Sequence, residues 1–104
     1  MLAALAGSAL ADDQVLEIAI HGAKPPTTPP VLSVLEKDRV VVRLTSDQPV
    51  SVHHHGYDIE SDVAPDHPTS LRFTANATGR FPIELHLKEP HKQRPLAYIE
   101  VRPR

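Results

Sequence analysis

The chain contains no cysteine and no tryptophan, and its one methionine is the first residue. Without thiols it can form no disulfide, thiol nucleophile, zinc ribbon or iron–sulfur cluster. It also cannot build a blue copper centre, which usually needs a cysteine, two histidines and a weak axial methionine. What the sequence has in excess is histidine, with seven among 104 residues, three of them consecutive at 53–55.

An excess of charge of one sign is also missing, because 11 Lys and Arg stand against 13 Asp and Glu, giving a net charge of −2. The chain therefore lacks the basic surplus that nucleic acid or an anionic membrane surface attracts. Its one long apolar run, residues 1–11, is too short to cross a bilayer, which needs about 20 apolar residues. We expect one domain with a single modest core, no nucleic-acid partner and no stable membrane insertion.

The first residues differ in composition from the rest. Residues 1–11, MLAALAGSALA, are small and apolar, and the change at Asp12 is abrupt. The last three of them fit the small-x-small site of signal peptidase, although no Lys or Arg precedes the run as in a complete signal peptide. We interpret 1–11 as a truncated signal peptide and 12–104 as the mature domain, which implies a periplasmic or secreted protein. A short amphipathic or core helix is the alternative.

The remainder alternates apolar and polar residues with a period of two, and turns rich in Pro, Gly, Asn and Asp interrupt it. The prolines clustered at 25–30 are incompatible with a helix or a central strand there. Residues 57–68 are expected to form a long polar loop. The predicted strands are residues 15–20, 31–35, 39–45, 50–55, 69–75, 80–87 and 96–101. About seven short strands with frequent turns predict an all-β protein, an antiparallel β-sandwich.

Three histidines lie on the predicted strand over 50–55. Side chains alternate across a strand, so His53 and His55 share the outer face if Val52 faces the core. His54 then falls on the core side, at the strand end, within reach of the rim.

A second predicted strand, 80–87, also places potential ligands outward. Its apolar residues alternate strictly, and a slip of one residue would bury charged side chains, so Glu84 and His86 face outward. If the two strands are neighbours, the cross-strand distance of about 4.5–5.5 Å brings His86 within reach of His53 or His55. Neutral imidazoles with a carboxylate suit Cu(II), Zn(II) or Ni(II). A solvated rim without metal is the alternative.

Several segments in order resemble the cupredoxin family. They are LEKDRV at 35–40, PVSVHHHGYD at 49–58, GRF at 79–81 and LAYIEV at 96–101. More narrowly, the chain is similar to small exported cupredoxin-like domains with a His-x-His-Gly-Tyr-Asp segment and a Gly-x-Phe-x-Ile-x-x-His segment. The resemblance covers nearly all of the mature chain. It implies a Greek-key β-sandwich in which the two histidine-bearing strands are neighbours in one sheet.

The resemblance also shows what is missing. Blue-copper cupredoxins carry a cysteine six residues after the glycine that opens the penultimate strand, and here that position is Leu85. The methionine of the following loop is absent too, so no type 1 copper site is implied. The pattern is closer to multicopper oxidases, whose His-x-His-Gly and a later histidine bind type 2 and type 3 copper. His53, His55 and His86 match those positions, and Glu84 stands where a further histidine would be.

We therefore predict an exported protein that binds copper, as Cu²⁺, for storage, delivery or tolerance, with zinc as the second candidate metal. The predicted ligands are His53, His55, His86, Glu84 and His54. Its partners would be the metal ion and a protein that donates or accepts it, and we do not expect an enzyme. The alternatives are a metal-free cupredoxin-like scaffold that serves as an interaction module, and an oligomeric type 2 copper oxidoreductase.

Overall fold

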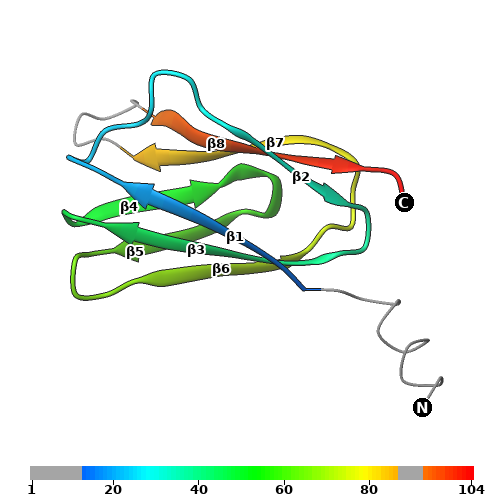
Figure 1. The fold of residues 1–104 in the computed structure, drawn as a ribbon, viewed down its shortest axis with the longest axis horizontal. Coiled ribbons are helices and arrows are strands. Elements are labelled where there is room, and N and C mark those ends of the chain that lie inside the picture. The colour runs from blue at the N-terminus through cyan, green and yellow to red at the C-terminus, as the bar shows by residue number, and fades with distance from the viewer. Residues whose placement is uncertain (1–12, 87–92) are drawn as a thin grey trace, which may run out of the picture.

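The computed structural model describes residues 13–86 and 93–104. In these ranges the chain is nearly all strand, with eight strands and one short 3-10 turn (Figure 1). The elements are β1 (Asp13–Ile20), β2 (Val31–Leu35), β3 (Arg39–Ser46), β4 (Val50–His54), η1 (His55–Tyr57), β5 (Ile59–Val63), β6 (Thr69–Thr74), β7 (Gly79–His86) and β8 (Gln93–Arg102). The predicted signal peptide lies outside the described residues. No helix in the described part of the chain has the length and hydropathy needed to span a membrane.

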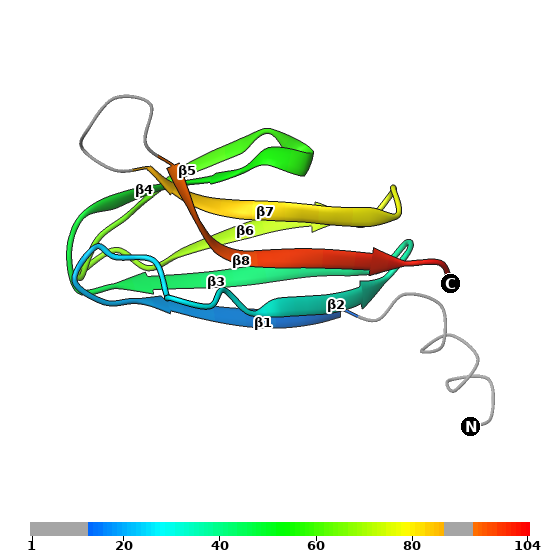
Figure 2. The same cartoon turned by 90° about the horizontal axis from the view of Figure 1, so that it is seen from above.

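The strands form two sheets that pack face to face, so the predicted all-β sandwich is confirmed (Figures 1 and 2). One sheet has the order β1-β3-β6, and the other has the order β2-β8-β7-β4-β5. The arrangement differs from the purely antiparallel one that we predicted, because β1 pairs with β3 and β2 pairs with β8 in parallel. The proline-rich crossing at 25–30 carries the chain from one sheet to the other. Strands β1 and β2 therefore do not form a hairpin, and each pairs with a later strand.

Strand β5 lies within the region that the sequence predicted to be a polar loop, so the count is eight strands rather than about seven. Val63 of β5 is buried, while Glu60 and Asp62 alternate on the exposed side. The strand is at the edge of its sheet and pairs only with β4 among the described strands. A short edge strand with acidic residues on one face gives little apolar signal, which is why the sequence pattern missed it.

Buried aliphatic side chains from both sheets form one core. In β7 the alternation predicted from the sequence is confirmed, since Ile83 and Leu85 are 0% exposed and the residues between and after them are only partly buried. Burial of these two side chains fixes the register of the strand, because a slip of one residue would exchange its two faces. Glu84 and His86 are thereby held on the outer face of the five-stranded sheet.

Lys37 in the turn between β2 and β3 has a backbone conformation that favours glycine. Its φ is 78°, and the turn around it is closed by the Asp38 N–H donating to the Leu35 carbonyl at 3.0 Å. An L-residue in this region costs about 1–2 kcal/mol, and glycine avoids this cost. The gain is reduced in part because glycine makes the unfolded chain more flexible, which favours the unfolded state. Lys37→Gly is therefore expected to raise the free energy of unfolding by about 0.5–1 kcal/mol in urea titrations. Lys37→Ala, which keeps the Cβ atom, is the control and should give no such gain.

Candidate metal centre

The site is built on three adjacent strands of the five-stranded sheet. Strand β4 lies between β5 and β7, and both pairings are antiparallel. In this register His53 is directly opposite Glu60 on one side and Glu84 on the other. His86 is opposite Ser51, so it lies diagonally from His53. The adjacency of the two histidine-bearing strands, which the residue pattern alone left open, is therefore present.

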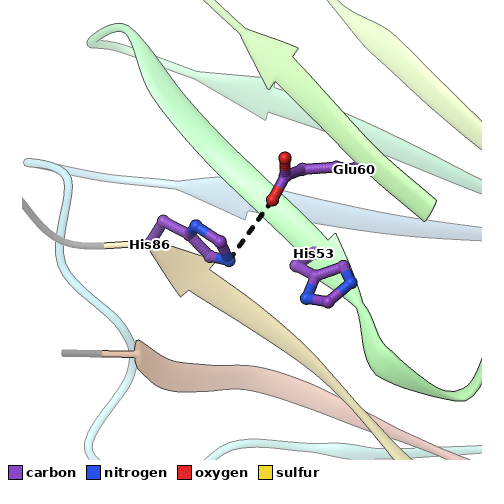
Figure 3. Close-up of side chains that lie close together, drawn as sticks. All are labelled: His53, Glu60 and His86. Carbon is purple, nitrogen blue, oxygen red and sulfur yellow. Dashed lines mark ion pairs between the residues drawn. The ribbon is translucent and has the colours of Figure 1, made fainter. Parts of the chain in front are cut away.

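Three side chains converge on the outer face, one from each strand (Figure 3). His53, Glu60 and His86 each offer a ligand atom, and these atoms all lie within 4.8 Å of one another. The Nε2 atom of His86 is 3.7 Å from Oε2 of Glu60. The two imidazole rings meet edge to face, with centroids 5.6 Å apart. Two imidazoles and one carboxylate are a donor set that can hold a divalent transition metal.

Two ring nitrogens of this group lack the partners that buried polar atoms normally have. Nδ1 of His53 and Nε2 of His86 are shielded from solvent and have no hydrogen-bond partner among the described residues. The two side chains as a whole are only 17% and 28% exposed. A buried nitrogen without a partner costs about 1–3 kcal/mol. A cation bound between the two rings would remove that cost, so the orphaned nitrogens mark the part of the face best prepared for a ligand.

The second predicted pair, His55 and Glu84, is brought together but is already satisfied. We predicted His55 to be the last residue of the strand, but it is the first residue of η1. Its Nε2 atom forms an ion pair with Oε1 of Glu84 and lies 2.9 Å from Oε1 of Gln93. The rings of His55 and His53 are 4.3 Å apart. Metal binding by His55 would have to displace these partners, so its contribution should be smaller than that of His53 or His86.

His54 points to the other side of the sheet and is not brought into this group. It is 0% exposed rather than at the rim, and its ring packs against Phe73 at 4.6 Å and Tyr57 at 5.0 Å between centroids. The pKa of its imidazole is lowered to about 4, mainly by burial and to a lesser extent by the charges of His53 and His55, while the Pro82 backbone acts in the opposite direction. Neither ring nitrogen makes a hydrogen bond of normal geometry among the described residues.

Glu60 is the residue of the cluster that sequence reasoning missed. It falls within the polar loop predicted over 57–68, whereas the structure places it on β5 opposite His53. The signal that could have found it is the alternation of Ile59, Ser61 and Val63 with two acidic residues. That alternation is compatible with an edge strand, and an edge strand next to β4 would direct its carboxylates to the same face as His53.

A groove borders the cluster on the side of His86. It has a volume of about 630 Å³ and is lined by residues at the start of β4, at the end of β5, in the turn that follows β5 and by His86 of β7. Ser51, Asp62, His67 and His86 are its polar lining residues, and its remaining lining is apolar or proline. His86 can therefore be approached from solvent even though its Nε2 atom is shielded.

In sequence, no family model and no curated protein matches the chain. In structure, many solved chains are similar to it, and three of them, all at low sequence identity, illustrate the likeness. A blue copper oxidase from Nitrosomonas europaea aligns with a TM-score of 0.65 and 16% identity over 89% of this chain and 40% of that chain. A copper-binding protein solved in its apo form aligns with a TM-score of 0.64 and 9% identity over 86% and 87%. The periplasmic domain of subunit II of the Bradyrhizobium japonicum cytochrome oxidase aligns with a TM-score of 0.60 and 13% identity over 85% and 83%.

These likenesses establish that the chain has a cupredoxin-like fold. The chain spans well under half of the blue copper oxidase but most of the two smaller proteins. The ordinary type 1 copper site of the fold does not fit this chain, because the chain has no cysteine. At the position that the resemblance gives for the cysteine ligand, the chain has Leu85, which is packed in the core. What fits a metal here is the outward cluster of His53, Glu60 and His86.

Proposed function

We propose that this chain is an exported copper-binding protein that holds Cu²⁺ at the outward cluster of β4, β5 and β7. The observation that carries the proposal is a pair of buried ring nitrogens, Nδ1 of His53 and Nε2 of His86, which have no hydrogen-bond partner among the described residues and lie beside the carboxylate of Glu60. His55 and Glu84 stand beside this cluster as an ion pair that can exchange its internal contact for the metal. His54, which we predicted as a further ligand, is a core residue in this proposal.

Copper is favoured over other metals by the donor chemistry. Imidazole and carboxylate ligands suit Cu²⁺, which binds such sites more tightly than Zn²⁺ does, and zinc remains the second candidate. This sequence has no cysteine and one methionine, Met1, so it offers no cluster of the thiolate and thioether ligands that select Cu⁺. The description of one similar structure as a copper-binding protein and of another as a blue copper oxidase supports the same choice.

A carrier or storage role suits the position of the cluster better than catalysis does. The groove beside His86 gives a donor or acceptor protein access to that side of the cluster. Export is inferred from the apolar residues 1–11 with a signal-peptidase site before Asp12. One similar structure is described as a periplasmic domain, which agrees with that inference.

Electron paramagnetic resonance of the protein loaded with one equivalent of Cu²⁺ tests the proposal. We expect a type 2 spectrum with hyperfine splitting from imidazole nitrogens and no intense blue absorption, because no thiolate is available. The variant His21→Ala, which removes an exposed histidine away from the cluster, should give the same spectrum. Failure to retain one copper per chain after desalting would contradict the proposal and favour the metal-free scaffold.

A further inference from the structure

Asp58 contacts the one ring nitrogen of His53 that does not face the cluster. Its Oδ1 atom is 3.2 Å from Nε2 of His53, and the Asp58 side chain as a whole is 96% exposed. An ionised carboxylate can only accept a hydrogen bond, so Nε2 of His53 must be the donor. A neutral imidazole with its proton on Nε2 has its lone pair on Nδ1, which is the buried nitrogen without a partner.

The turn that follows β4 holds Asp58 in this position. Gly56 in η1 packs so closely on Phe81 of β7 that a Cβ atom there would lie 2.7 Å from the ring. The Tyr57 hydroxyl accepts a hydrogen bond from the Asn76 N–H at 3.0 Å, which ties the turn to the segment after β6. Asp58 itself is in the left-handed region, with φ 52° and ψ 47°, and this reversal directs the chain from η1 into β5.

We propose that Asp58 is a positioning residue that fixes His53 in the Nε2–H tautomer and thereby selects Nδ1 as its metal-binding atom. The inference rests on the proposed metal site. Metal-binding histidines commonly donate their other N–H group to a carboxylate, which holds the ring orientation and raises the basicity of the ligand nitrogen. Here the donor and the acceptor are only five residues apart in the chain. The conformation of the turn after β4 therefore determines whether Asp58 can reach the ring of His53.

Two substitutions at Asp58 separate the hydrogen bond from the backbone conformation. Glycine and asparagine both accept a left-handed φ, so neither should strain the turn. Asp58→Gly removes the acceptor, and loss of such a partner typically lowers metal affinity about 10–100-fold, which we expect for Cu²⁺. Asp58→Asn keeps an acceptor oxygen at the same place and should stay within about 5-fold of the wild-type affinity, well short of that loss.

The tautomer is measured directly in the metal-free protein by ¹⁵N chemical shifts of the His53 ring. We expect Nε2–H as the dominant form in the wild type and in Asp58→Asn, and a mixture of both tautomers in Asp58→Gly. A wild-type ring protonated on Nδ1 would overturn the inference, and so would an unchanged copper affinity in Asp58→Gly when His53→Ala abolishes binding. If His53→Ala itself leaves the affinity unchanged, the proposed function fails instead, and the tautomer shifts still decide what Asp58 does.

Discussion

Replacing His53 and His86 together by alanine is expected to lower the affinity for Cu²⁺ by more than about 100-fold, since loss of a supporting residue alone costs 10–100-fold. These two side chains supply the buried ring nitrogens that have no hydrogen-bond partner among the described residues, and without them Glu60 is the one ligand left of the cluster. Competition against a chelator of known affinity, read by isothermal titration, measures the change. Equal affinity in the wild type and the double variant would show that the site is elsewhere.

The fold should survive this double substitution, which keeps the measurement interpretable. Both rings lie on the outer face, and their removal also removes two buried nitrogens that have no hydrogen-bond partner in the part of the chain that the structure describes. We therefore expect a midpoint of thermal unfolding in the metal-free double variant no lower than in the wild type. His55→Ala is the graded comparison, and it should weaken binding less, because Nε2 of His55 already has Glu84 and Gln93 as partners.

The sequence was sufficient to predict the outward direction of His53, Glu84 and His86. That prediction depended only on the two-residue period of a strand and on the charged residues that a shifted register would bury. It held because Ile83 and Leu85 are fully buried between the sheets. The same reasoning placed His54 on the core side, where the structure has it.

The pairing of strands could not be predicted from the local pattern. Strand alternation says which face a side chain takes, but it does not say which strand lies beside it. Glu60 joins the cluster because β5 forms a hairpin with β4, and its alternation was obscured by acidic residues. His55 lies in η1 and not in the strand. Gly56, the next residue of η1, packs closely on Phe81, and a contact between residues so far apart in the sequence leaves no local signal.

His54 is expected to make the metal-free protein sensitive to acid. Burial lowers the pKa of its imidazole to about 4, whereas in the unfolded chain this side chain has the ordinary histidine pKa of 6.5. The stability that the neutral ring provides is therefore complete above pH 6.5 and is lost as the pH falls toward 4, because only the unfolded state takes up the proton in that window. The shift corresponds to about 3 kcal/mol of unfolding free energy between pH 7 and pH 4.

The variant His54→Leu, which is close in volume and cannot titrate, isolates this effect. Leucine also removes two buried nitrogens without hydrogen bonds of normal geometry, so we expect the variant to be more stable than the wild type even at pH 7, by about 1–3 kcal/mol. Urea titrations at pH 7 and pH 4 should show the gap between the two proteins widening by about 3 kcal/mol at the lower pH. His67→Leu, at an exposed position, should follow the wild type at both pH values. A constant gap between His54→Leu and the wild type would mean that His54 takes up its proton in the folded state, so the core around Phe73 and Tyr57 must open to accept the charge.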